Sequence, residues 1–168
     1  SAVGSLGRVR DLKRDFDPKY LKLTYRAKQA FNDQFSKVRD LSPEAEAEMD
    51  GYVRFRADAV RHVSTLLKEL SGAAVTQQEL DRSLLAEPNA GAGGWLDVFA
   101  GDGPPRFKSK MEAAIAFSEK AIARANYLRN AKGFSPEQIA QAVKDGSISK
   151  AMSLNGIDAE YRRMANEF

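Results

Sequence analysis

The chain has 168 residues, enough for one domain with a hydrophobic core, and 43% of them are hydrophobic. No apolar run reaches the ~18–20 residues of a membrane-spanning helix, and the lack of cysteine excludes disulfides and thiolate metal sites. The net charge of +3 is unevenly distributed, because residues 1–40 carry ten Lys or Arg against five Asp or Glu, whereas residues 41–90 carry five against nine.

The first sixteen residues are basic and contain glycine and serine breaks before a short amphipathic run. Charges occupy the positions where a signal peptide has an apolar segment, so we expect no signal peptide in this piece. We predict a flexible basic arm over residues 1–16 or, alternatively, part of a helix whose other half lies elsewhere. The arm is a candidate for binding DNA or an acidic partner, although charged, solvated helix faces have the same composition. Its basic residues are Arg8, Arg10, Lys13 and Arg14.

A capping residue followed by proline is typical of a helix start, and the pattern recurs along the chain. Asp17-Pro18 predicts a helix to about residue 38, and Ser42-Pro43 predicts an antiparallel helix over 43–70. Asp102-Gly103-Pro104-Pro105 predicts a helix over 105–131, with Gly133 ending it. Together with the connections between them, these helices form the bundle that we expect over residues 17–132.

The segment that follows residue 43 has an apolar stripe with steps of three and four residues, interrupted only by Arg56. Gly72 is suited to end this helix. Thr76 and Glu79 then form the pattern of a capping box, which predicts a short helix over 77–86 that stops before Pro88. A second stripe, on the helix over 105–131, is rich in small residues, and lysines including Lys108 and Lys110 occupy the rest of its surface. It consists of Phe107, Met111, Ala114, Ser118, Ala121, Ile122, Ala125 and Leu128.

Residues 87–94 form the only glycine-rich loop, but they lack the GK[ST] of a phosphate-binding loop and open no helix. An apolar segment follows, with Trp95, Leu96 and Phe99. We expect it to cap one end of the bundle. The alternative is an exposed patch that docks on another protein.

The tail over residues 133–168 is predicted as short helices broken by glycine. Ser135 and Gln138 have the spacing of a capping box, with Pro136 between them. This helix ends near Gly146, a short one covers 148–154, and the last begins at Asp158. A helix-turn-helix is an alternative, but its recognition helix has one basic residue. We expect the tail to pack on the bundle or on a neighbouring copy.

Catalytic and metal-binding constellations are not evident. His62 is the only histidine, so a metal or a nucleophile would find no second His or Cys beside it. Glu44, Glu46 and Glu48 advance by two residues and therefore point to different sides of a helix. We expect no catalytic residues, no metal, no cofactor and no enzymatic activity.

One stretch resembles helical regions of tailed-bacteriophage virion proteins, the internal or DNA-ejection proteins. The resemblance covers about residues 50–130 and lies in Leu70-Ser71-Gly72-Ala73-Ala74-Val75-Thr76 with Glu79 and Pro88, then Pro105, Phe107, Lys108, Lys110 and Met111. Residues 89–103 are a long insert relative to that pattern. The transglycosylase signature of some of these proteins is absent here, so that activity does not carry over. The resemblance implies a structural virion module present in several copies.

The expected fold is all-α, with three long helices, a short cross-helix and a helical tail. The expected function is a non-enzymatic structural and interaction module that self-assembles, with other copies or other virion proteins as partners. The alternative is a nucleic-acid-binding helical domain that uses the basic arm on DNA. We expect no membrane span, and a location in the virion or the bacterial cytoplasm.

Overall fold

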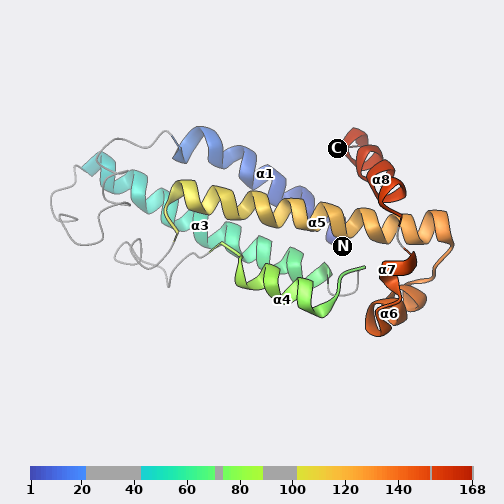
Figure 1. Ribbon diagram of the computed structural model, residues 1–168. Coiled ribbons are helices and arrows are strands. Elements are labelled where there is room, and N and C mark those ends of the chain that lie inside the picture. Colours follow the sequence, from blue (N-terminus) through green and yellow to red (C-terminus); the bar gives the residue numbers. More distant parts are fainter. Residues whose placement is uncertain (22–42, 71–73, 89–101, 152, 168) are drawn as a thin grey trace. The chain divides into compact units, whose positions relative to one another are not determined.

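The computed structural model describes residues 1–21, 43–70, 74–88, 102–151 and 153–167. These residues form seven helices and no strand, so the predicted all-α class is confirmed. The helices, labelled as in Figure 1, are α1 (Ala2–Tyr20), α3 (Pro43–Glu69), α4 (Gln77–Leu85), α5 (Pro104–Lys132), α6 (Pro136–Asp145), α7 (Ile148–Ala151) and α8 (Leu154–Glu167).

Contacts divide the chain into two compact units. Unit 1 comprises Ser1–Leu6, Thr65–Ala86 and Ala114–Phe168, and unit 2 comprises Gly7–Ser64 and Glu87–Ala113. Helices α1, α3 and α5 each have residues in both units. The residues of the tail share unit 1 with parts of α1, α3 and α5.

Residues 1–16 belong to helix α1, which agrees with the helical alternative for this segment and not with a flexible arm. The helix also continues through Asp17-Pro18, where the sequence predicts a helix start, so that expectation is corrected. Apolar side chains at Leu6, Val9 and Phe16 are fully buried. Burial of such a face supplies most of the stability of a helix in a protein, and here it outweighs the glycines and the proline. The rest of the helix predicted to residue 38 lies outside the described residues.

The two predicted apolar stripes are buried. All eight residues predicted for the stripe on α5 are buried, Ser118 among them, with its hydroxyl donating to the carbonyl of Ala114 at 2.7 Å. On α3 the stripe is also buried, except that Val60 is partly exposed. Helix α3 ends at Glu69, one residue before the predicted end, whereas Gly72 lies outside the described residues. Periodicity therefore predicted the inward faces of both long helices correctly.

The two predicted capping boxes form as expected. The Glu79 amide donates to the Thr76 hydroxyl at 3.2 Å, and the Thr76 amide donates to the Glu79 carboxylate at 2.9 Å, which opens α4 at Gln77. Ser135 and Gln138 make the same reciprocal pair at the start of α6. Gly133 has a φ of 67°, and beyond it the Phe134 amide donates to the Leu128 carbonyl at 3.0 Å. This left-handed turn closes α5 and redirects the chain into α6.

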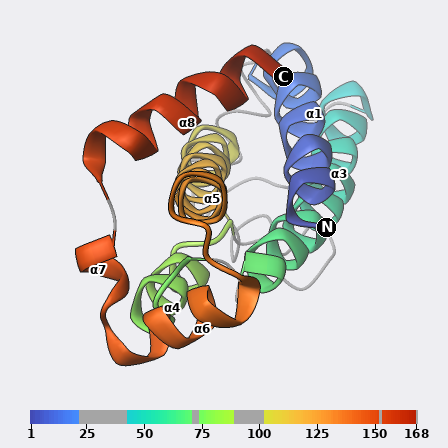
Figure 2. The ribbon, with the colours of Figure 1, turned by 90° about the vertical axis from the view of Figure 1, so that its right-hand side faces the viewer.

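The last three helices lie around the final turns of α5, as Figure 2 shows for this part of unit 1. Ile139 and Ala142 of α6 and Ile148 of α7 share a hydrophobic cluster with Tyr127 and Leu128 of α5. The tail thus packs on α5 of its own chain. Exchange with a neighbouring copy stays a prediction.

Helix α8 begins at Leu154, four residues before the predicted start, so Asn155-Gly156 lies inside it and not between two helices. Ser153 is the missed start signal, because its hydroxyl accepts from the Gly156 amide at 3.3 Å and its carbonyl from the Ile157 amide at 2.9 Å. Gly156 is required for packing, since a Cβ at this position would overlap the ring of Tyr127.

Replacing Gly156 with Ala should lower the free energy of unfolding by about 2 kcal/mol, because overpacking exceeds the gain in helix propensity. Chemical denaturation measures it. The matched control is Gly51→Ala, also inside a helix, where a Cβ meets nothing within 4 Å. This control should gain about 0.5–1 kcal/mol. Equal changes in the free energy of unfolding for the two variants would show that the Tyr127 ring does not restrict the side chain at position 156 of α8.

Candidate functional site

Asp102 is the residue on which several polar side chains of unit 2 converge. It lies just before α5 and is 5% exposed. Its carbonyl oxygen accepts hydrogen bonds from the Tyr52 hydroxyl at 2.8 Å and from Arg56 Nη1 at 3.2 Å, both on α3. Its carboxylate pairs with Nζ of Lys110 at 2.9 Å and with Nε of Arg106 at 3.4 Å. Asp102 therefore joins the start of α5 to the middle of α3.

Arg56 explains the gap in the apolar stripe of α3. The side chain is fully buried, and its guanidinium lies 5.5 Å from the centroid of the Tyr52 ring. Burying a charge is costly unless the charge finds partners, and the Asp102 carbonyl and the aromatic ring provide two. At this position of the stripe, Arg56 thus holds α3 to Asp102 by a hydrogen bond where an apolar residue would make only van der Waals contacts.

Aromatic rings pack around Tyr52. Phe16 of α1 packs against Tyr52 and Phe107 with ring centroids 6.2 and 5.8 Å apart, and Tyr20 packs against Tyr52 at 5.4 Å. The Tyr20 hydroxyl donates to the carbonyl of Gly51 at 3.1 Å. Burial raises the pKa of Tyr20 and, much more strongly, that of Tyr52, for which the Arg56 guanidinium offsets only part of the shift. Both hydroxyls therefore act as neutral hydrogen-bond donors.

The structure separates the basic residues predicted to bind nucleic acid. Arg10, Lys13 and Arg14 are three and four residues apart and share one side of α1, whereas Arg8, two residues before Arg10, points away from them. Lys13 Nζ lies 3.5 Å from the carboxylate of Glu112 on α5. The side of α1 that carries these three residues therefore faces α5 within unit 2.

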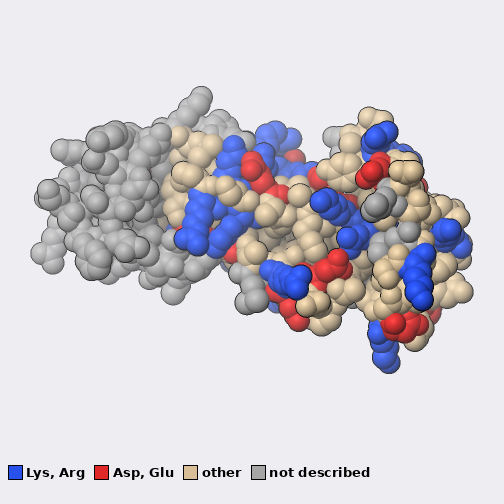
Figure 3. All heavy atoms as spheres, in the orientation of Figure 1, with Lys and Arg blue, Asp and Glu red and all other residues tan. Residues whose placement is uncertain are grey.

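Three basic residues of α5 continue this surface. Lys108 Nζ lies 3.8 Å from Glu112, the carboxylate that also pairs with Lys13. In Figure 3, Lys and Arg side chains gather over the start of α5 and the adjoining part of α1. We call this group the basic surface. It covers both flanks of the start of α5, since Lys108 lies beside Lys13 and Glu112, whereas Arg106 and Lys110, each two residues from Lys108, lie on the flank that pairs with Asp102. Its members are Arg10, Lys13 and Arg14 of α1 and Arg106, Lys108 and Lys110 of α5.

From the sequence, Lys108 and Lys110 are expected on the surface of their helix, but nothing links them to the basic residues of α1. Lys13 and Glu112 are almost a hundred positions apart, so no local pattern predicts their contact. The spacing of four residues between Asp102 and Arg106 predicts that these two side chains pair at the start of α5. It does not predict which other helix lies beside them.

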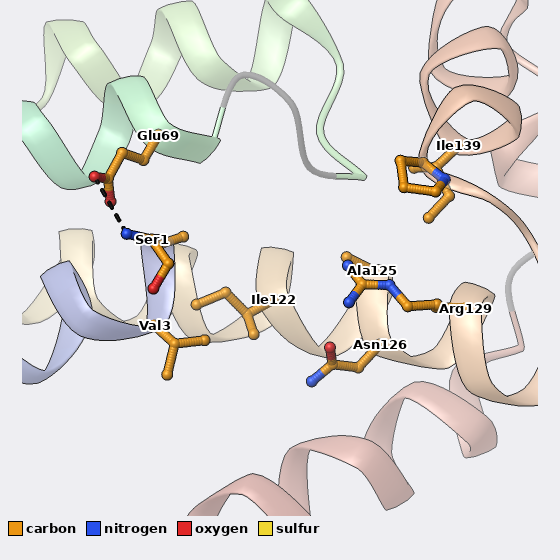
Figure 4. Close-up of a pocket in the computed structure, with 10 residues that line it drawn as sticks. Ser1, Val3, Glu69, Ile122, Ala125, Asn126, Arg129 and Ile139 are labelled. Carbon is orange, nitrogen blue, oxygen red and sulfur yellow. Dashed lines mark ion pairs between the residues drawn. The ribbon is translucent and has the colours of Figure 1, made fainter.

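Unit 1 has a hollow of about 350 Å³, drawn in Figure 4. Its wall is mainly aliphatic, with Ile122 and Ala125 of α5 and Ile139 of α6, and Asn126 and Arg129 are its polar members on α5. The amino group of Ser1 lies 3.7 Å from the carboxylate of Glu69 at its edge. The volume is at the lower end of the range of small-molecule sites.

The remaining predicted positions take no part in a site. The predicted patch of Trp95, Leu96 and Phe99 lies outside the described residues. His62 lies 3.9 Å from the Asp58 carboxylate one helical turn away, and both side chains are partly exposed. Within the described part of the chain, no three His, Asp or Glu side chains gather as metal ligands would.

Among the carboxylates that the structure describes, Glu79 and Asp145 have a lowered pKa. Burial alone would raise the pKa of Glu79, but hydrogen bonds from Thr76 and from Arg124, whose Nη1 is 2.9 Å away, outweigh it. For Asp145 the cause is the hydrogen bond with Ser147 at the turn after α6. Each carboxylate stabilises a helix end, so both shifts arise from capping.

No family model, curated protein or solved structure matches the chain. Among the helices that the structure describes, none has both the length and the apolar character needed to cross a membrane.

Replacing Arg56 with Ala should reduce the free energy of unfolding by about 3 kcal/mol, because the change leaves a cavity and removes a hydrogen bond to Asp102. Arg56→Met, which keeps the apolar stem, should cost less. Arg54→Ala is the control on the same helix, at an exposed position, and should change stability by under about 0.5 kcal/mol. Denaturation curves measure all three. Similar losses of stability for Arg54→Ala and Arg56→Ala would refute the role of Arg56 as a buried link between α3 and Asp102.

The lowered pKa of Glu79 predicts an acid-sensitive contribution to stability. This contribution is present above the unfolded pKa of about 4.5 and is lost as the pH falls through the lower folded pKa. Glu79→Gln should therefore be less stable than the wild type at neutral pH, and the difference should shrink on acidification. Thermal melts of the wild type and the variant, from neutral pH down to below the unfolded pKa, measure this difference in stability, and Glu137→Gln at an exposed position is the control. A difference in stability that does not change with pH would contradict the prediction.

Proposed function

We propose that this chain is a non-enzymatic structural module that assembles with copies of itself through its outer helix faces, as a segment of a tailed-phage virion. One observation carries the non-enzymatic part. In the described residues, the four side chains with a clearly shifted pKa each hold a helix or a turn together. In an enzyme such groups are expected to face a shared cleft.

The partners of these four groups support this proposal. Tyr20 and Tyr52 donate to backbone carbonyls of Gly51 and Asp102, and Glu79 accepts from Thr76 and Arg124. Asp145 accepts from the Ser147 amide at 2.8 Å. The hollow in unit 1 is lined by none of them. The four groups with shifted pKa values therefore stabilise the fold, and we expect the protein to function through contacts made by its surface.

Assembly through helix faces is supported by apolar groups that remain exposed. Val3 of α1 and Tyr161 of α8, both in unit 1, are large hydrophobic residues with substantial exposure. The Tyr161 hydroxyl is held by Glu119 at 2.8 Å, which orients its ring on the surface of α8. An oriented aromatic ring contributes contact area at a small cost in conformational entropy.

The virion part of the proposal rests on the resemblance between residues 50–130 and helical regions of phage virion proteins. Several of the resembling residues have structural roles here. Thr76 and Glu79 form the capping box, while Phe107 and Met111 belong to the buried stripe of α5. These residues would set the same helix turn and packing in a virion protein.

Light scattering after size exclusion tests assembly. The chain should form an oligomer as its concentration rises, and added salt should not dissociate it, because apolar helix packing is not screened by ions. Tyr161→Ser should weaken the association, whereas Tyr127→Phe, at a buried position, should leave it unchanged. A chain that is monomeric at every concentration and salt would refute self-assembly. Antibodies against the chain should label phage particles, and an absence of labelling would refute the virion part.

A further inference from the structure

We propose that the basic surface of α1 and α5 binds the phosphate backbone of nucleic acid without reading its sequence. This binding is a second activity and does not require assembly. The surface lies within unit 2, where the Lys13–Glu112 pair joins the two helices. It differs from the basic arm expected from the sequence, because it includes α5 and excludes Arg8.

The charge balance of the surface favours an anionic ligand. The six basic residues have three acidic partners among them, Asp11, Asp102 and Glu112, so the cations outnumber the carboxylates with which they pair. The Asp102 carboxylate is itself buried beneath Arg106 and Lys110, with a side-chain exposure of 6%. The side chains of Arg14 and Arg106 are 74% and 76% exposed. Arg14 and Arg106 therefore lie toward solvent, whereas Lys13, Lys108 and Lys110 are only partly exposed, and the Asp102 carboxylate lies below Arg106 and Lys110.

The start of α5 supplies positive charge through its side chains. Its first two residues, Pro104 and Pro105, have no amide hydrogen, so the backbone offers few donors to an anion at this end. Arg106 lies in the first turn, with Lys108 and Lys110 on the next.

Glu112 shows what kind of group the surface accepts. Its carboxylate lies within 4 Å of two ammonium groups from two helices, Lys13 at 3.5 Å and Lys108 at 3.8 Å. Its side chain is about half exposed, and ion pairs at such positions contribute little to stability. A phosphate oxygen has the same acceptor chemistry and can replace the carboxylate between the two lysines.

The composition of the surface fits backbone contact, not base recognition. Its members are Lys and Arg of two adjacent helices, and Arg14, Arg106 and Lys110 pair with Asp11 or Asp102 instead of projecting together from one helix face, as side chains that read base edges in a groove do. Contacts to phosphate position a protein on nucleic acid but carry no sequence information. Affinity should therefore depend on salt and be similar for different sequences.

Fluorescence anisotropy with short labelled DNA duplexes of two unrelated sequences, at several salt concentrations, tests the proposal on the whole chain. Both duplexes should bind equally, and binding should weaken steeply with salt. Arg14→Gln combined with Arg106→Gln should weaken binding about tenfold and lower the slope of log K against log salt by about 2. Arg8→Gln is the matched control, a basic residue exposed on the same helix, and should have little effect.

Glu112→Gln gives the opposite test. Removing this carboxylate raises the local charge and releases two lysines, so the variant should bind duplex DNA several-fold more tightly at low salt. Circular dichroism checks that each variant is folded. Three results would overturn the proposal: no duplex binding at low salt, equal losses for Arg8→Gln and the double variant, or weaker binding by Glu112→Gln. A double variant that binds DNA normally but no longer self-associates would also overturn the proposal, because the basic surface would then bind another copy of the chain.

Discussion

The contact between α3 and the start of α5 at Asp102 is the constraint on which unit 2 depends. One backbone carbonyl accepts from Tyr52 and Arg56, while the carboxylate of the same residue pairs with Lys110 and Arg106. Because the two sides of Asp102 bind different helices, the residue fixes both where α5 begins and how it is rotated. That rotation turns Phe107 inward against Phe16 and Tyr52, and it leaves Arg106 at the surface.

Charges in unit 2 have two separate roles. Arg56 is fully buried and holds two helices together, whereas Arg14 and Arg106 are largely exposed. Net charge alone does not distinguish these roles, since a buried arginine and a solvated one count equally. The chain as a whole is only slightly basic, and yet in the described part of unit 2 Lys and Arg side chains gather at the start of α5 and the adjoining part of α1. Burial therefore decides which of the basic residues can meet a ligand.

The sequence predicted those parts of the fold that local signals determine. The stripes of α3 and α5 follow helical periodicity, and Thr76, Glu79, Ser135 and Gln138 form the caps that their spacing indicates. Prediction failed where tertiary packing outweighed a local signal. In α1, buried Leu6, Val9 and Phe16 maintain a helix through Asp17-Pro18, and in α8 contact with Tyr127 places Gly156 inside a helix. The basic surface was out of reach because it depends on which helices are neighbours.

The close approach of Gly156 to Tyr127 also implies a pairwise evolutionary constraint. Since the ring occupies the volume that any side chain at position 156 would need, the two positions cannot vary independently. In homologous chains, glycine should persist at 156 wherever an aromatic residue stands at 127, and a larger residue should appear there only with a smaller one at 127. Covariation of this pair would then identify distant relatives that keep the same junction between α5 and α8.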